Sequence, residues 1–165
     1  MVAVGVGSLI LGFVASFYVV SARSFASFGC YTDLNKQDRY TSDVLTRDIR
    51  SASQVVSYSS TQLNLIAGDG SYLRYTYYSG SNTLVRTNGG ISRILLRDIT
   101  PGTFSFSVYQ RPTNASPTFE SFPAATNAAN VKLIGFQWSC STTVPATTMP
   151  QSESLKSGLV SIRNQ

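Results

Sequence analysis

The chain has 165 residues, a length that suits one domain with an anchoring segment. Charged residues make up only 13% of the sequence and histidine is absent, which removes the commonest general base and the commonest metal ligand. The net charge of +5 comes from scattered lysines and arginines rather than from a run of basic residues, so no nucleic-acid partner is expected.

Residues 1–22 form an apolar stretch without a single charge, and Arg23 is the first charged residue of the chain. About 20 apolar residues in helical conformation span ~30 Å, the thickness of the hydrocarbon core of a bilayer. The stretch therefore predicts a transmembrane helix, which forms the first half of a longer helix.

Small residues recur at a spacing of four within this stretch. Ser8, Gly12 and Ser16 follow one another at this interval, and Ala3 and Gly7 share it. Small side chains on one face let a second helix approach closely in lipid, so we expect these five residues to make helix–helix contacts. The alternative is that glycine, serine and alanine are simply common in membrane helices.

The helical pattern continues beyond Arg23 to about Ser53, with no proline and with Gly29 as the only glycine. Charged residues alternate there with an apolar stripe, which predicts an amphipathic second half over residues 23–54. The stripe consists of Leu34, Leu45, Ile49, Ala52 and Val56. Asp43 lies four residues from both Arg39 and Arg47, a spacing that favours ion pairs along the helix.

A different interpretation treats residues 1–22 as a secretory signal sequence. Val20, Ser21 and Ala22 fit the small-residue rule for cleavage, although nothing basic precedes the apolar stretch. The mature chain would then begin near Arg23.

Residues 55–165 alternate apolar and polar side chains, which predicts a β-rich domain. Strands are expected over 55–59, 62–67, 72–79, 83–87, 91–98, 103–111, 131–141 and 155–163, with long loops at 112–130 and 142–154. A sheet with one apolar face needs a cover, and the stripe of Leu34, Leu45, Ile49 and Ala52 is available for it. The expected fold class is α+β, with one long helix packed on an antiparallel sheet.

Chemistry-bearing residues are sparse. The sequence contains no nucleophile–base pair, no cluster with metal-ligand spacing and no glycine-rich phosphate loop, so we expect neither catalysis nor a cofactor. Glu120 and Glu153 are the only acids in the long loops, too few for a calcium site. Cys30 and Cys140 leave two alternatives open: a disulfide in an exported domain, or two free thiols.

Several segments, in this order along the chain, resemble type IV pilin-like proteins, in particular J-type minor pseudopilins of type II secretion and W-type minor pilins. They are the apolar opening at 1–12, the helix end at 43–52, the segment at 82–96 and the closing residues 160–164. Precursors of this family carry a basic leader and a Glu at the fifth mature position. Met1 would correspond to about the sixth or seventh mature residue, so both features are missing from this sequence.

The resemblance implies a structural subunit without catalytic activity. Residues 1–22 would hold it in the bacterial inner membrane with its body outside the cytoplasm. Other pilin or pseudopilin subunits and an assembly platform would be its partners, and apolar helices would bundle in the filament core. The alternative function is a secreted or surface-anchored β-domain adhesin with a signal sequence, cleaved or uncleaved.

Overall fold

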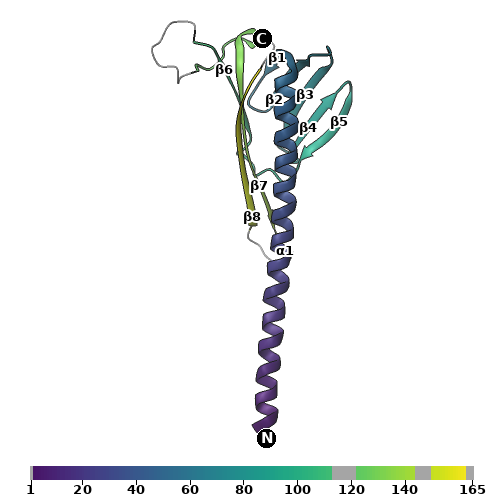
Figure 1. Ribbon diagram of the computed structural model, residues 1–165, viewed down its shortest axis with the longest axis vertical. Coiled ribbons are helices and arrows are strands. Elements are labelled where there is room, and N and C mark those ends of the chain that lie inside the picture. The colour runs from purple at the N-terminus through teal and green to yellow at the C-terminus, as the bar shows by residue number, and fades with distance from the viewer. Residues whose placement is uncertain (1, 113–121, 144–149, 163–165) are drawn as a thin grey trace.

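The structure, a computed structural model, describes residues 2–112, 122–143 and 150–162. One helix, α1 (Val2–Ser51), runs unbroken for 50 residues and carries a β-rich body along its second half (Figure 1). At 1.5 Å per residue this helix is ~75 Å long. The predicted fold class is confirmed: a long helix with an apolar first half packs on antiparallel β-structure.

The helix ends at Ser51, slightly earlier than expected, because the chain turns directly into strand β1 (Ala52–Tyr58). The amide of Gly68 donates to the carbonyl of Ser51 at 2.9 Å and so satisfies one of the free carbonyls at the helix end. Residues 52–54 thus belong to the sheet, not to the amphipathic helix. Val56, expected on the helical stripe, lies instead in β1 with 42% of its surface exposed.

A five-stranded antiparallel meander follows, in the order β1-β2-β3-β4-β5. Glycine permits left-handed backbone at two of its turns, where Gly70 has φ +83° and Gly90 has φ +85°, and Asn82 adopts it at the turn of residues 79–82 with φ +51°. At the first of these turns the Asp69 carboxylate accepts a hydrogen bond from the Ser71 amide at 2.9 Å. After β1 the strands are β2 (Gln62–Ala67), β3 (Tyr72–Tyr78), β4 (Thr83–Asn88) and β5 (Ile91–Leu96).

The remaining strands form a second antiparallel sheet, β6 (Ser105–Gln110), β7 (Val131–Thr143) and β8 (Pro150–Ser161). β7 and β8 are longer than expected, so residues 142, 143 and 150–154 are strand rather than loop. The predicted loop at 112–130 contains the short 3-10 helix η1 (Ala128–Asn130), and its residues 113–121 lie outside the described part of the chain.

Aromatic side chains fill the space between the two sheets. The ring of Phe104 stacks on Tyr77 at 4.8 Å between centroids and lies 6.4 Å from Trp138, which stacks on Phe136 at 5.1 Å. Backbone bonds also hold the connection between the two sheets against β7, including one from the Thr100 amide to the Ser139 carbonyl at 2.8 Å. One continuous apolar core therefore runs through both sheets.

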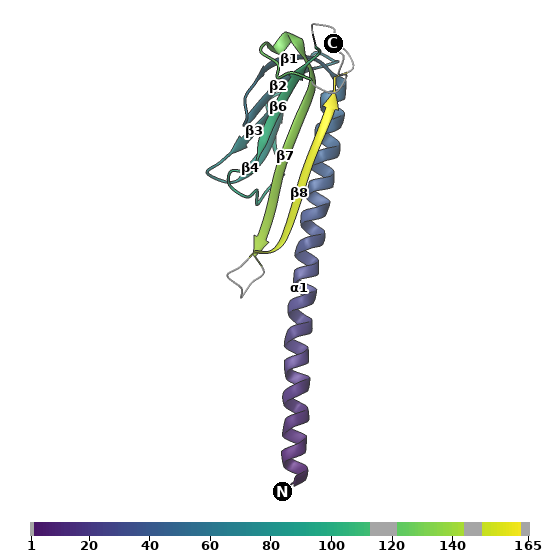
Figure 2. The same cartoon turned by 90° about the vertical axis from the view of Figure 1, so that its left-hand side faces the viewer.

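α1 packs against β8, β7, β5 and β2. Figure 2 shows β7 and β8 running alongside the upper half of the helix, with the lower half projecting beyond the body. The two sheets and the helix thus share the core, and the N-terminus lies at the end of the helix farthest from the body.

Candidate assembly helix

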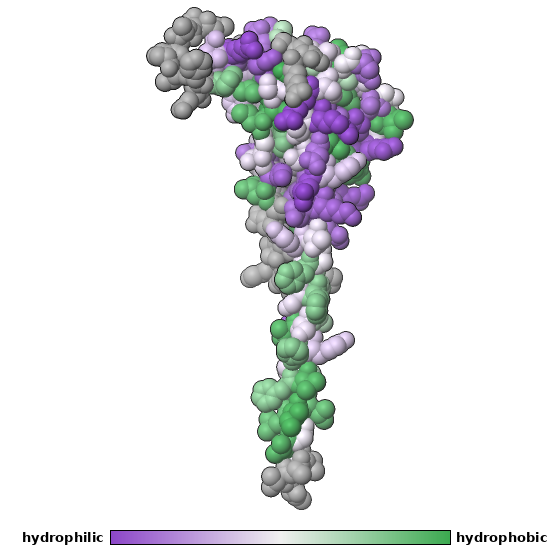
Figure 3. All heavy atoms as spheres, viewed as in Figure 1, coloured by the Kyte–Doolittle hydropathy of each residue, from purple (hydrophilic) through white to green (hydrophobic). Residues whose placement is uncertain are grey.

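The first half of α1 presents its apolar side chains on all sides. Large apolar residues from Val6 to Val20 are each at least 47% exposed, and Phe17 reaches 75%. Figure 3 shows this hydrophobic stalk below a predominantly hydrophilic body surface. By length and composition the helix can cross a membrane, and no part of its most apolar window is buried in the protein. An exposed apolar surface of this extent marks a site that lipid or another protein covers.

Three of the predicted contact residues lie on one face of this half. Ser8, Gly12 and Ser16 line a shallow groove of about 340 Å³ together with Leu9 and Phe13. The Ser8 hydroxyl donates a hydrogen bond to the Gly5 carbonyl at 2.9 Å, within the helix. The groove therefore offers a surface of small residues on which the Ser8 hydroxyl already has a partner.

Gly7 and Ala3, the other two predicted contact residues, fall on the opposite side of α1, about 140° and 180° around the helix from Gly12. No atom lies within 4 Å of the position that a side-chain Cβ at Gly7 would take. Ala3 lies in the helix, but its side chain falls outside the described part of the structure. The structure thus leaves the Gly7 surface open.

The second half of α1 is buried on one side. The exposed fraction is 4% for Leu34 and zero for Leu45 and Ile49, three of the four residues predicted to pack on the sheet. Val44 joins them at 6%. Ala52, the fourth predicted residue, is also fully buried, but it is part of β1 and not of the helix. Leu34 is the first buried residue along the described helix, so the contact between helix and body begins there.

A buried carboxylate links the helix to the second sheet. Asp38, 1% exposed, accepts a hydrogen bond from the Trp138 indole Nε1–H at 2.8 Å. Its other oxygen, Oδ2, is buried without a hydrogen-bond partner among the described residues. Because a buried indole N–H needs an acceptor, this bond fixes the level at which β7 sits along the helix.

A second carboxylate links the helix to the first sheet. Asp48 Oδ2 accepts from the Tyr75 hydroxyl at 2.6 Å and from Arg86 Nε at 2.6 Å. Burial and the hydrogen bond to Asp48 raise the pKa of Tyr75 well above its ordinary value. Although burial opposes it, the pKa of Arg86 is also raised, by its bonds to Asp48 and Tyr75. The three groups form a closed, charge-compensated network.

The sequence did not predict Asp38 and Asp48 as polar anchors of the helix, because charged residues on an amphipathic helix are ordinarily solvated. A third anchor is Thr41, fully buried, whose hydroxyl donates to the Leu95 carbonyl of β5 at 3.0 Å. The one available signal was position: at 100° per residue Asp38, Thr41 and Asp48 fall within or beside the apolar stripe.

The expected ion pairs of Asp43 with Arg39 and with Arg47 do not form. Within the described residues both ion pairs go to Asp48, from Arg86 Nε at 2.6 Å and from Arg47 Nε at 3.8 Å. Asp43 and Arg39 are exposed, where an ion pair contributes little and competes with water. The packed surface of α1, rather than its exposed surface, therefore carries the helix charges that matter for the fold.

Cys30 and Cys140 are free thiols, the second of the two alternatives. Burial, with the nearby Asp38 carboxylate, raises the pKa of the Cys140 thiol. Cys140 thus lies near the level of Asp38, while Cys30 lies eight residues, or ~12 Å, closer to the N-terminus of the helix. A disulfide needs Cα atoms within ~7 Å, so this register keeps the thiols apart.

The buried polar groups are suited to holding elements together. Both Tyr75 and Cys140 have a raised pKa, which is the opposite of what activates a nucleophile. In residues 2–112, 122–143 and 150–162 no three His, Cys, Asp or Glu side chains are grouped as metal ligands. The feature that stands out as a site is the uncovered helix itself.

Comparison with protein-family models, with curated proteins and with solved structures finds no significant match to this chain.

Proposed function

We propose that this chain is a non-catalytic structural subunit of a type IV pilin-like filament, either a pilus or the pseudopilus of type II secretion. One observation carries the proposal: α1 changes character at Leu34. Beyond Leu34 the body covers one side of the helix, and before it the large apolar side chains of the described residues are exposed. The exposed apolar half of such a helix needs a cover other than water. In an assembling subunit, lipid covers it before assembly and neighbouring helices cover it afterwards.

Assembly exchanges one apolar environment for another. In the inner membrane, lipid tails cover the residues from Val6 to Val20, and in the filament the helices of other subunits cover them. Lipid is as apolar as a leucine side chain, so the exchange gains nothing from water exclusion and depends on close packing. The groove at Ser8, Gly12 and Ser16 allows this close packing.

The body must follow the helix when the subunit leaves the membrane. Asp38 and Asp48 tie the helix to the two sheets by buried hydrogen bonds to Trp138, Tyr75 and Arg86. These bonds, with the buried stripe, make the upper helix and the body one mechanical unit. An assembly platform that moves the helix would thereby move the body, which faces away from the cytoplasm.

The test is a bulky substitution in the groove. We expect Gly12→Leu to leave insertion into the inner membrane intact, because leucine is apolar, but to exclude the subunit from surface filaments. Gly29→Leu makes the same change at an exposed glycine of α1 outside the apolar half, and is the matched control. Immunoblots of the membrane fraction and of filaments sheared from cells report the two steps. Equal incorporation of both variants would contradict the proposed contact face.

A secreted or surface-anchored adhesin is the second candidate, and one observation favours it. Buried contacts of α1 begin only at Leu34, so removal of residues 1–22 would leave the packing of the body untouched. The mass of the mature protein separates the two functions. A chain that begins near Arg23 supports the adhesin, and a chain that retains the apolar stretch supports the filament subunit.

A further inference from the structure

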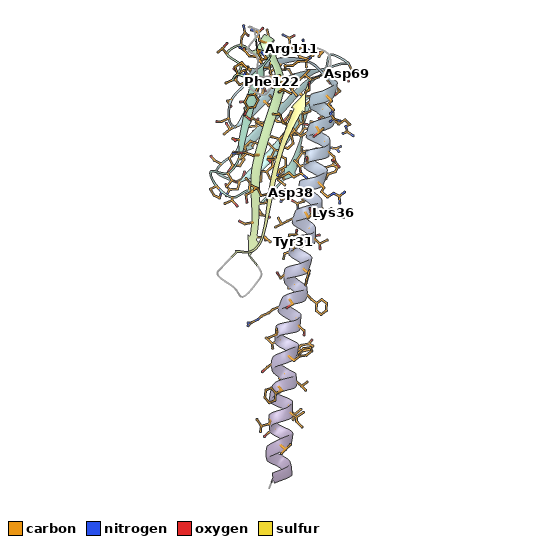
Figure 4. The ribbon with its side chains drawn as sticks, turned by 60° about the vertical axis from the view of Figure 1, so that its left-hand side comes forward. Tyr31, Lys36, Asp38, Asp69, Arg111 and Phe122 are labelled. Carbon is orange, nitrogen blue, oxygen red and sulfur yellow. The ribbon has the colours of Figure 1, made fainter. Side chains whose placement is uncertain are left out.

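A short exposed segment of α1 lies between the apolar stretch and the part of the helix that the body covers. Phe25, Phe28 and Tyr31 are exposed by 75%, 70% and 49%, and they precede Leu34, where burial by the body begins. Figure 4 shows Tyr31 where the body ends and the free part of the helix begins, below Asp38. Three aromatic rings are thus presented within two turns of helix.

Charged residues are more frequent in this segment than in the apolar stretch and less frequent than in the helix that follows. Arg23 is the only charged residue before Asp33, whereas charged residues recur every few positions from Asp33 onward. Aromatic side chains with an occasional arginine are typical of the boundary between hydrocarbon and water: the rings sit at headgroup level, and the long arginine side chain keeps its charge in water.

We propose that Arg23, Phe25, Phe28 and Tyr31 form an interfacial collar that lies in the headgroup layer of the bilayer and sets the depth of the helix. The inference rests on the membrane-inserted stage of the proposed function. Its occupant is a lipid surface, because the collar continues without a break from a helix that can cross a membrane.

The dimensions agree with this placement. Each headgroup layer is about 5 to 7 Å thick. With Arg23 at the edge of the hydrocarbon core, Phe25 and Phe28 lie ~3 and ~8 Å farther along the axis, and Tyr31 lies ~12 Å farther. Helical side chains lean back toward the N-terminus, so the Phe28 ring falls within the layer, and the Tyr31 ring brings its hydroxyl to the outer edge of the layer.

The arrangement places the body directly above the membrane surface. Leu34 follows Tyr31 by less than one turn, so little free helix remains between the collar and the body. The body would therefore stand at a fixed height, ready for contact with neighbouring bodies as soon as subunits meet in the membrane.

Tryptophan scanning with depth-resolved quenching tests the collar. The full-length protein is reconstituted in vesicles of phosphatidylcholine and phosphatidylglycerol whose acyl chains are brominated either near the headgroup or near the chain end. Four variants are compared: Tyr18→Trp, Phe25→Trp, Phe28→Trp and Tyr40→Trp. The native Trp138 is fully buried in the body and gives the same background in each variant.

We expect Phe25→Trp and Phe28→Trp to lose most emission to bromine near the headgroup, and Tyr18→Trp to bromine near the chain end. Tyr40, 58% exposed on the body-bearing half, should give no quenching when replaced. If Tyr18→Trp is quenched but Phe25→Trp and Phe28→Trp are not, or are quenched chiefly by deep bromine, the collar is wrong and the membrane anchor stands. If Tyr18→Trp is not quenched either, the membrane-inserted stage of the proposed function fails as well.

Discussion

Asp38 on the long helix and Trp138 on β7 lie 100 residues apart in sequence and meet through a 2.8 Å hydrogen bond. Both side chains are buried, with exposed fractions of 1% and zero. The bond is the point at which the second sheet is registered against the helix.

Removal of this acceptor should destabilise the protein. Asp38→Ala leaves the Trp138 indole N–H buried without a partner, and we expect a loss of about 1 to 3 kcal/mol in the free energy of unfolding. Asp38→Asn retains a carbonyl acceptor and should lose less. Urea unfolding of the full-length protein in detergent, followed by Trp138 fluorescence, measures both changes. Asp33→Ala, at an exposed position of the same helix, is the control. A loss no larger for Asp38→Ala than for Asp33→Ala would contradict this role.

The Asp48 network predicts unequal effects of its two donors. Arg86→Met removes the cation from a buried carboxylate and should lower the free energy of unfolding by about 2 to 3 kcal/mol. Tyr75→Phe removes one neutral donor but leaves the cation, so a loss of about 1 kcal/mol is expected. The same unfolding assay applies. Arg93→Met, at the exposed cross-strand partner of Arg86 on β5, should change stability little. Equal losses for Arg86→Met and Arg93→Met would contradict the network.

The raised pKa of Cys140 predicts a dependence of stability on alkaline pH. Burial keeps the thiol protonated in the folded state, whereas the unfolded thiol ionises near its ordinary pKa of about 8.5. The stabilisation is therefore complete below about pH 8.5 and is lost as pH rises, by up to about 1.4 kcal/mol per unit. Unfolding free energies between about pH 7.5 and 9.5 should fall less steeply for Cys140→Ala than for the parent protein.

Cys30→Ala is the matched control for this pH dependence. Cys30 is partly exposed on the helix below the body, so its replacement should leave the slope unchanged. A parent protein whose stability is flat across this pH range, or a slope that Cys30→Ala abolishes, would contradict the assignment to Cys140.

The cross-strand pair Phe136 and Gly158 predicts a steric requirement for glycine. A Cβ at Gly158 would lie 2.4 Å from Phe136 Cζ, and this ring is buried in the core. Gly158→Ala forces the ring to move and should cost about 1 to 3 kcal/mol of unfolding free energy. Gly80→Ala, where no atom lies within 4 Å of the added Cβ, should be tolerated. Thermal unfolding compares the two, and equal stability would show that the core accommodates the methyl group.

The sequence was sufficient to predict elements with a strong local signal. The apolar stretch, the absence of proline and the apolar stripe predicted the long helix, although Ala52 and Val56 at the end of the stripe lie in β1. The dipeptide Asp69-Gly70 is a local hairpin signal, and it forms the turn between β2 and β3. These signals are local because a helix period or a turn dipeptide involves only neighbouring residues.

The rest depended on contacts between distant residues. Asp38 is buried beside its donor Trp138, and Asp48 is buried beside its donors Tyr75 and Arg86. No local pattern in the sequence identifies these partners. The strands were likewise predicted one by one, but their division into two sheets follows from how the chain crosses after Leu96. For the same reason the register that separates Cys30 from Cys140 could not be predicted.

The central claim is that the apolar half of α1 contacts the same half of other subunits through its small-residue face. Cysteine cross-linking in intact cells measures this directly. Ser8→Cys and Ser16→Cys are introduced with Cys30→Ser, so that the remaining native thiol, Cys140, is buried. Tyr40→Cys, exposed on the half of the helix that carries the body, is the control. We predict that mild oxidation gives a ladder of cross-linked oligomers for Ser8→Cys and Ser16→Cys and only monomer for Tyr40→Cys. Monomer for all three variants would contradict the account.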